Sequence, residues 1–155
     1  MSATTTRRPV AQERALKLFI ILTRAASSIN RRLHSHVDFQ GLTFTEFEIL
    51  EALYHKGPLL LGDVQRKILL SSGGVTYTVD RLAEKGLVER RDCPTDRRAR
   101  YAALTPKGEA LIAKIFPAHA DRIEDTMSVL TAREQEQAID ALRRLGRSAA
   151  ATSEE

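Results

Sequence analysis

The stretch LLSSGGVTYTVDRLAEKGLVERRDCPTDRRARYAALT, residues 69–105, decides the fold. Its apolar residues Val75, Val79 and Leu82 recur at i, i+4 and i+7, a spacing that places them on one face of a helix. The serine pair before them can cap the first turn, and Gly86 can supply the left-handed residue that often ends a helix. The pattern predicts a helix of about four turns.

The N-terminal half of this predicted helix carries small, uncharged or hydroxyl-bearing residues: Ser71, Ser72, Gly73, Gly74, Thr76 and Tyr77. Glycine costs a helix about 1 kcal/mol relative to alanine, so one interpretation is simply a weak helix start. The other interpretation is close approach to a ligand. Amides at the helix N-terminus would reach a phosphate, while hydroxyls and Arg81 would reach base edges in a DNA major groove. The helix alone does not decide between them.

The segment after the helix predicts a β-hairpin with a basic tip. Residues 87–91 and 100–105 are short and strand-compatible, and turn-forming Asp, Pro and Thr lie between them. Positions 81–100 hold seven basic and four acidic residues, an excess of three in a chain whose formal net charge is +4. A charged turn by itself is usually just solvated. A basic hairpin directly after a small-residue helix favours a surface that binds a polyanion.

Residues 42–105 resemble the winged helix-turn-helix of the MarR family of bacterial ligand-responsive transcription regulators. The motifs that carry the resemblance are LSSGGVTYTVDRLAEKGLVERR at 70–91 and DRRARYAALTPKG at 96–108. With the flanking helices, the resemblance extends over roughly residues 14–146. It implies a mainly α-helical fold with a small β-wing, in which the winged helix-turn-helix is flanked by N- and C-terminal dimerisation helices.

The resemblance and the residue chemistry together nominate a DNA-binding surface. Side chains on the outer face of the helix would contact base edges in the major groove or position the helix there: Ser71, Ser72, Thr76, Tyr77 and Arg81. Gly74 would allow the helix backbone to approach the DNA closely. At the wing tip the family has an Asp followed two positions later by an Arg that reaches the minor groove, here Asp96 and Arg98. The remaining arginines complete the predicted surface. Arg97 and Arg100 would assist Arg98 in the minor groove, and Arg90 and Arg91 would contact phosphates.

The chain of 155 residues fits one domain of ordinary size. We expect a disordered tail at 1–12, a single MarR-type domain at 13–147 and a polar tail at 148–155. Within the domain, the winged helix-turn-helix would occupy about 42–105, with dimerisation helices at about 13–37 and 106–147. Thr43 and Glu46 have capping-box spacing for a helix that Gly57 ends, and residues 59–61 could add a third strand. Gly146 is expected to end the last helix.

Composition argues against several other classes of protein. One cysteine, Cys93, excludes an internal disulfide framework and suits a reducing cytoplasm, where we expect the protein to be. The N-terminus has no apolar signal region, and no apolar run approaches the ~20 residues of a membrane span. No nucleophile elbow, phosphate-binding loop or HExxH motif occurs, so we expect neither an enzyme nor a cofactor.

The predicted first helix is apolar nearly all round in its N-terminal third, at Leu16, Leu18, Phe19, Ile20 and Ile21. Such a helix needs more than one partner surface. One side can face its own domain, and the other predicts a second subunit, since an exposed patch of this size would be sticky. In a two-fold dimer, the two recognition helices would lie about 34 Å apart and read an inverted repeat of double-stranded DNA.

Family members carry a ligand pocket between the dimerisation helices and the winged domain. By that resemblance the candidate ligand-binding residues are Arg24, Ser28, His36, Phe39, Phe47, Tyr54 and His119. Their aromatic and histidine content favours a small aromatic or phenolic effector.

A metal site is disfavoured because His34 and His36 at i, i+2 face different directions and no cysteine or acidic cluster joins them.

The resemblance therefore implies a ligand-responsive regulator, a homodimeric repressor released from its operator by the effector. Two alternatives remain open. Cys93 lies among arginines that favour a thiolate, so the regulator could instead respond to oxidants. A winged helix could also serve only as a protein-interaction module, with its arginines providing solubility and no DNA binding.

Overall fold

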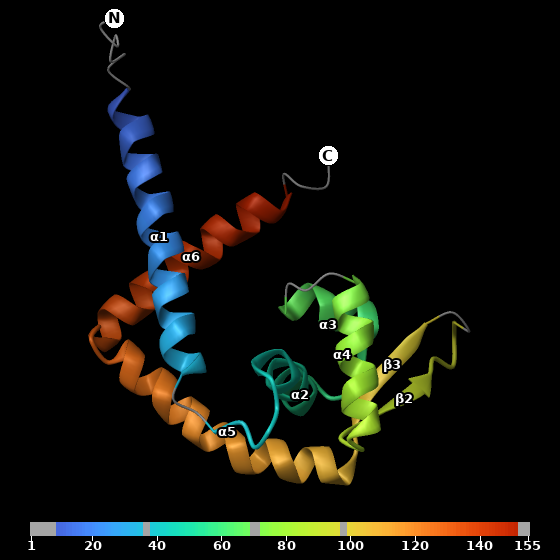
Figure 1. Cartoon of the computed structure of the whole chain (residues 1–155). Helices are drawn as coiled ribbons and strands as arrows, with labels where there is room; N and C mark the ends of the chain where they lie inside the picture. The colour runs from blue at the N-terminus through green and yellow to red at the C-terminus, as the bar shows by residue number, and fades with distance from the viewer. Residues whose placement is uncertain (1–8, 36–37, 69–71, 97–98, 152–155) are drawn as a thin grey trace, which may run out of the picture. The chain divides into compact units, whose positions relative to one another are not determined.

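The computed structural model describes residues 9–35, 38–68, 72–96 and 99–151 (Figure 1). It divides into two compact units, residues 1–37 and 38–155. The described part of the first unit forms helix α1 (Val10–His34). The second contains, in chain order, α2 (Phe44–Lys56), β1 (Leu59–Leu60), α3 (Leu61–Ile68), α4 (Ser72–Glu84), β2 (Val88–Asp92), β3 (Arg100–Leu104), α5 (Pro106–Met127) and α6 (Ala132–Ala151). This is the predicted mainly helical winged helix-turn-helix.

The wing is a three-stranded antiparallel sheet with strand order β1-β3-β2. Val88 lies opposite Leu104 at the base of the hairpin, and Asp92 lies opposite Arg100 towards its tip. On the other side of β3, Leu59 pairs with Ala102. The short apolar run at 59–61 therefore does contribute the third strand. Figure 1 shows the hairpin beside α4, with α3 on the other side of that helix.

The core of the second unit lies between α2, α4, the base of the sheet and α5. Its largest fully buried side chains include Phe47, Leu50, Leu82 and Ile112. Burying one such side chain stabilises the fold by about 1.5–3 kcal/mol. The apolar stripe predicted for 75–82 is buried as expected, with Val79 and Leu82 completely inaccessible to solvent. α4 therefore packs one face inward and is free to present the other.

Local signals position the start of α2, the end of α4 and the start of α5. The capping box of α2 forms: the Thr43 backbone amide donates to Glu46 Oε2 at 2.8 Å, and the Glu46 amide donates to Thr43 Oγ1 at 3.2 Å. After α4, Gly86 has the left-handed φ of 70° that permits the chain to turn into β2. Thr105 caps α5 by accepting a hydrogen bond from the Gly108 amide.

Gly108 also marks the closest approach between α5 and the start of the wing. A Cβ added there would lie 2.0 Å from the backbone oxygen of Leu87. The same oxygen accepts a hydrogen bond from the Thr105 amide at 3.1 Å. Only glycine fits this position, so α5 is locked against the segment that joins α4 to β2.

Two predicted helix boundaries were wrong. α1 begins at Val10 and not at 13, because the Pro9 carbonyl accepts the first amides of the helix, from Gln12 and Glu13. α6 continues through Gly146 to Ala151, so residues 148–151 belong to a helix and not to a tail. A glycine ends a helix when it adopts a left-handed conformation, and Gly146 does not adopt one. None of the described helices combines the length and the apolar composition that a membrane span requires.

Candidate nucleic-acid interface

The outward face of α4 is exposed and polar, as the nucleic-acid interpretation requires. Thr76, Tyr77 and Asp80 are exposed, and the Tyr77 side chain is 63% accessible. Thr78 is nearly buried, and its hydroxyl donates to the Gly74 carbonyl at 2.7 Å. The half-exposed Gly74 thus contributes through its backbone to the first turns of the helix. A helix of this kind can enter a major groove with its outer side chains against base edges.

A buried carboxylate of α2 holds the C-terminal end of α4. Glu46 is 1% exposed, and Lys85 Nζ donates to both of its carboxylate oxygens at 2.8 Å. Arg81 Nε lies 3.5 Å from Glu46 Oε1. Burial raises the pKa of Glu46, but the Lys85 hydrogen bond, the Thr43 amide and the charges of Lys85 and Arg81 together hold it below its ordinary value of 4.5. Glu46 is therefore ionised at neutral pH.

Arg81 connects this buried carboxylate to the exposed face of α4. Its guanidinium carbon lies 5.9 Å from the centre of the Tyr77 ring, within the range of a cation–π contact. The phenol of Tyr77 and the charge of Glu46 both raise the pKa of Arg81. The Arg81 side chain remains 42% exposed. Arg81 and Tyr77 thus form a partly exposed pair on the surface predicted to read DNA.

The described arginines of the wing form ion pairs with nearby carboxylates. Arg90 Nη2 lies 2.6 Å from Asp80 Oδ1 and so joins β2 to α4. Arg91 pairs with Glu89 at 2.6 Å, and Arg100 pairs with Asp92. The three arginine side chains are between one third and just over half exposed, so each pair is weak and can exchange a carboxylate for a phosphate.

Several predicted contact residues lie outside the described residues. These are Ser71, Arg97 and Arg98, together with the side chain of Ser72, whose backbone begins α4. Asp96 is described and exposed, and its carbonyl accepts a hydrogen bond from the Ala99 amide at 3.1 Å across the wing tip. The structure brings Thr76, Tyr77, Arg81 and Arg90 together on adjoining parts of α4 and β2, and the minor-groove role of Arg98 stays a prediction.

Cys93 is half-buried at the end of β2. Its Sγ lies 3.3 Å from Thr95 Oγ1. The Thr95 hydroxyl and backbone lower the pKa of the Cys93 thiol, with smaller contributions from Asp96 and Tyr101. From the sequence, we expected neighbouring arginines to lower the pKa of the Cys93 thiol. Among the described residues, the hydrogen bonds of the turn lower it, whereas Arg97 lies outside the described residues.

Comparison with known proteins identifies the architecture. The MarR family profile matches residues 40–99. The HTH-type transcriptional regulator MhqR of Bacillus subtilis (strain 168) is 48% identical over 134 residues, which cover 86% of this chain and 92% of MhqR. The chain belongs to the MarR family. MarR-family proteins are DNA-binding transcriptional regulators and not enzymes, and this chain shares their winged helix-turn-helix.

Two solved structures are similar to most of this chain. BpsR of Bordetella bronchiseptica, whose DNA binding is regulated by 6-hydroxynicotinic acid, has a TM-score of 0.73 at 27% identity, covering 84% of this chain and 98% of BpsR. A MarR family regulator of Streptomyces coelicolor in complex with DNA has a TM-score of 0.75 at 22% identity, covering 94% of this chain and 92% of that regulator. This second similarity supports the fold.

The ligand-binding residues nominated for this MarR-family chain fall into separate groups. Phe39, Phe47 and His119 come together, with Phe44, in an aromatic cluster in which the Phe47 and His119 rings are 4.8 Å apart. Phe47 and His119 are buried, so part of this cluster is core. Tyr54 belongs to a second cluster, 6.3 Å from the ring of Phe116.

The other three nominated residues belong to the first unit. Arg24 and Ser28 are exposed residues of α1, in the first unit, and His36 lies outside the described residues. Within the part of the chain that the structure describes, no group of three or more His, Cys, Asp or Glu side chains is arranged to hold a metal ion.

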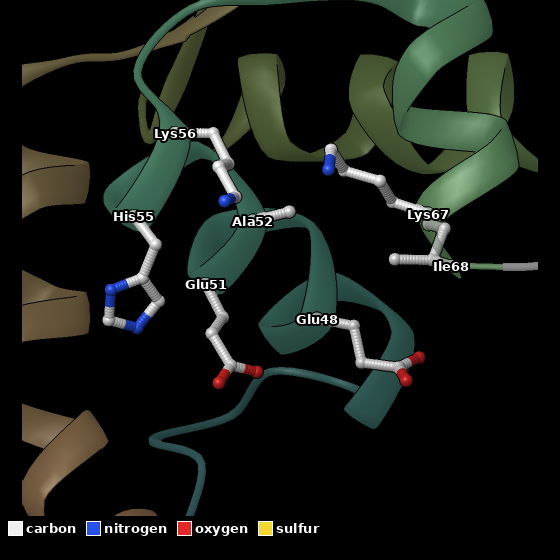
Figure 2. Close-up of a pocket in the computed structure, with 7 residues that line it drawn as sticks. All are labelled: Glu48, Glu51, Ala52, His55, Lys56, Lys67 and Ile68. Atoms are coloured by element: carbon white, nitrogen blue, oxygen red, sulfur yellow. The ribbon is translucent and has the colours of Figure 1, made fainter. Parts of the chain in front are cut away.

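A hollow of about 280 Å³ lies between α2 and α3. Figure 2 shows Glu48, Glu51 and His55 along α2, and Lys67 and Ile68 of α3 close the other side. Burial raises the pKa of Glu48, and the charge of Glu51 raises it further. Burial likewise raises the pKa of Glu51, which His55 partly offsets. No sequence motif had singled out this hollow.

The sequence prediction missed that Glu46 and Asp80 form ion pairs with the predicted contact residues Arg81 and Arg90. Glu46 was explained by the capping box alone, although its spacing to Leu50 and Leu53 places it on the buried stripe of α2. A charged residue at such a position indicates a buried ion pair. For Asp80, ten positions before Arg90, the signal could come only from the packing of β2 against α4.

Proposed function

We propose that this MarR-family regulator is a homodimeric repressor that binds an inverted-repeat operator and is released by a small aromatic or phenolic effector. The observation that carries the operator-reading part is the exposed polar face of α4, with Tyr77 and Arg81 outward, beside the basic wing. Such a helix reads base edges while arginines on the adjoining strands contact phosphates.

The proposal of a homodimer rests on exposed apolar side chains. On α1, Leu18, Phe19 and Ile21 are each more than half exposed, and on α6 Leu142 and Leu145 are each 46% exposed. Apolar surface of this extent on two helices favours burial against a second copy. The elements from α1 to α6 would form the single domain of each protomer. Two-fold symmetry would present two α4 helices to two half-sites about 34 Å apart.

The proposal of an aromatic effector rests on the cluster of Phe39, Phe44, Phe47 and His119 and on the similarity to BpsR. Aromatic rings suit a flat ligand, and the imidazole of His119 could orient a hydroxyl or carboxylate group. An effector can release DNA only if it binds the free conformation more tightly than the DNA-bound one. Arg24, Ser28, His36 and Tyr54 remain predicted contributors.

Selection of bound fragments from the source genome, followed by anisotropy titration of the selected duplex, tests this function. We expect the selected duplex to bind at least 1000-fold more tightly than a scrambled duplex of equal length, the lower end of the range for specific regulators, ~10³–10⁷. Phenolic and hydroxynicotinic acids should weaken specific binding. Equal binding of both duplexes would refute operator recognition, and absence of any salt-sensitive binding would favour the protein-interaction module.

The wing has its own test. Arg98→Ala should weaken binding to the selected duplex and reduce the slope of log affinity against log salt by about 1 if one phosphate contact is lost. Arg143→Ala on exposed α6 is the control, because it removes an equal charge from a different element. An unchanged slope in Arg98→Ala would exclude this wing residue from the mechanism.

Response to an oxidant is a second candidate, favoured by the lowered pKa of Cys93. With one cysteine in the chain, oxidation would end in a bond between subunits or in a mixed disulfide with a small thiol. If this candidate is correct, peroxide with glutathione should release the wild-type chain from DNA and leave Cys93→Ser bound. Equal release of both proteins would exclude it.

A further inference from the structure

We propose that Glu46 is a positioning residue for DNA recognition: from α2, it fixes Arg81 and Lys85 so that Arg81 and Tyr77 are held ready to meet base edges. The inference rests on the operator-binding part of the proposed function. Glu46 is a buried residue of α2 and would not touch DNA itself. It acts through the side chains of α4.

The geometry of the carboxylate supports this role. Glu46 Oε2 accepts hydrogen bonds from the Thr43 amide and from Lys85 Nζ, each at 2.8 Å. Oε1 accepts from Lys85 Nζ at 2.8 Å and lies 3.5 Å from Arg81 Nε. Because the side chain of Glu46 is 2% exposed, these contacts are shielded from water and solvent ions far better than a surface pair.

Neighbouring contacts hold the end of α4 to which Glu46 attaches. The Lys107 ammonium donates to the Lys85 carbonyl at 2.9 Å, and the Thr105 hydroxyl donates to the Gly86 carbonyl at 2.7 Å. The backbone at the end of α4 is therefore fixed from α5, while Glu46 fixes side chains from α2. The pairing of Arg81 with Tyr77 then depends on the Glu46 charge more than on the position of the helix.

Arg81 has one side towards Glu46 and the other towards Tyr77. Its Nε faces the carboxylate, and its guanidinium carbon lies 5.9 Å from the centre of the aromatic ring. An arginine restrained in this way loses less conformational freedom on meeting a base than a freely rotating one. Restraining Arg81 in this way contributes to the discrimination between DNA sequences. The general attraction of the protein for phosphate does not require a restrained arginine.

Glu46→Gln separates positioning from charge and from capping. Glutamine still suits the capping box and can accept from the Thr43 amide, but it removes the charge that holds Arg81 and Lys85. The change makes the protein more positive by one unit, so simple electrostatics would strengthen binding to every duplex. The control is Thr43→Ala, which removes the hydroxyl that caps the Glu46 amide at 3.2 Å and leaves the carboxylate in place.

The experiment measures the affinities of each variant for the selected duplex and for the scrambled duplex, with thermal melting alongside. For Glu46→Gln we expect the ratio of the two affinities to fall about tenfold, with scrambled binding unchanged or slightly stronger. For Thr43→Ala the ratio should stay within about twofold of wild type. In an Arg81→Ala background, Glu46→Gln should change the ratio by less than about twofold, because the side chain that Glu46 positions is gone.

Three outcomes would overturn the inference. The first is an unchanged ratio in Glu46→Gln while the wild-type chain still discriminates between the duplexes. The second is a full Glu46→Gln effect that persists without Arg81, and the third is an equal loss of both affinities that follows a lowered melting temperature. A wild-type chain that binds both duplexes equally would instead refute operator recognition, and this inference with it.

A measurement on the wild-type chain alone guards against a variant that fails to fold. The Arg81 Nε–H resonance in nitrogen-edited NMR, assigned by its loss in Arg81→Lys, should be resolved and should exchange slowly with water when no DNA is present. An averaged, rapidly exchanging resonance would show that Glu46 does not restrain Arg81.

Discussion

Glu46, Glu48 and Glu51 of α2 show how environment separates carboxylates of the same helix. Hydrogen bonds and cations more than offset the burial of Glu46 and lower its pKa, whereas burial raises the pKa of Glu48 and of Glu51. The contribution of Glu46 to stability is present above its unfolded pKa, near 4.5, and is lost as the pH falls through its lower folded value. Glu46 therefore makes the fold sensitive to acid.

The two carboxylates of the hollow between α2 and α3 should behave in the opposite sense. The pKa values of Glu48 and Glu51 are raised in the folded state. Their contribution to the stability of the fold is therefore most favourable below the unfolded pKa of 4.5, and it is lost as the pH rises through the folded pKa. Glu48→Gln should therefore raise the melting temperature at pH 7, by up to about 3 °C for a half-exposed group, and the gain should vanish near pH 4. Glu136→Gln on exposed α6 is the control. A gain that is independent of pH would contradict the prediction.

At the scale of elements, the docking of α5 depends on Gly108. Gly108→Ala would place a methyl group 2.0 Å from the Leu87 carbonyl oxygen, so the first turn of α5 or the start of β2 must move. We expect a loss of about 3 kcal/mol in the free energy of unfolding, measured by urea denaturation. Gly146→Ala is the matched control, because a Cβ there meets nothing within 4 Å, and it should gain up to about 1 kcal/mol. Equal stability of the two variants would contradict the assigned contact.

The elements themselves could be predicted wherever the signal was local. The spacing of Val75, Val79 and Leu82, the capping box at Thr43 and the left-handed Gly86 each act within one or two turns, and the structure agrees with all three. Gly146 failed as a stop signal because a glycine's conformation also depends on the residues that follow it. The pair of Glu46 and Lys85 spans 39 positions, so it arises only when α2 and α4 pack, and no local pattern contains it.

At the scale of the whole molecule, assembly should control DNA binding. Phe19 of α1 is 67% exposed in the single chain, and a glutamate in its place would bury a charge in the proposed dimer. Phe19→Glu should raise the dimer dissociation constant at least about 100-fold and leave one half-site contact per protein, with a matching loss of operator affinity. Lys17→Ala on the same helix, which also makes the net charge one unit more negative, is the charge control. Sedimentation at micromolar concentration checks both, and an unchanged dimer would remove α1 from the interface.

The edge strands of the wing sheet affect how readily the protein aggregates at high concentration. One edge strand, β1, is only two residues long, and the other, β2, has four successive exposed charged residues from Glu89 to Asp92. Unpaired strand edges invite fibrous stacking, which short length and charge both oppose. The arginines that suit the wing to a nucleic acid thus also keep neighbouring molecules from extending its sheet, and a concentrated stock should stay free of cross-β aggregates.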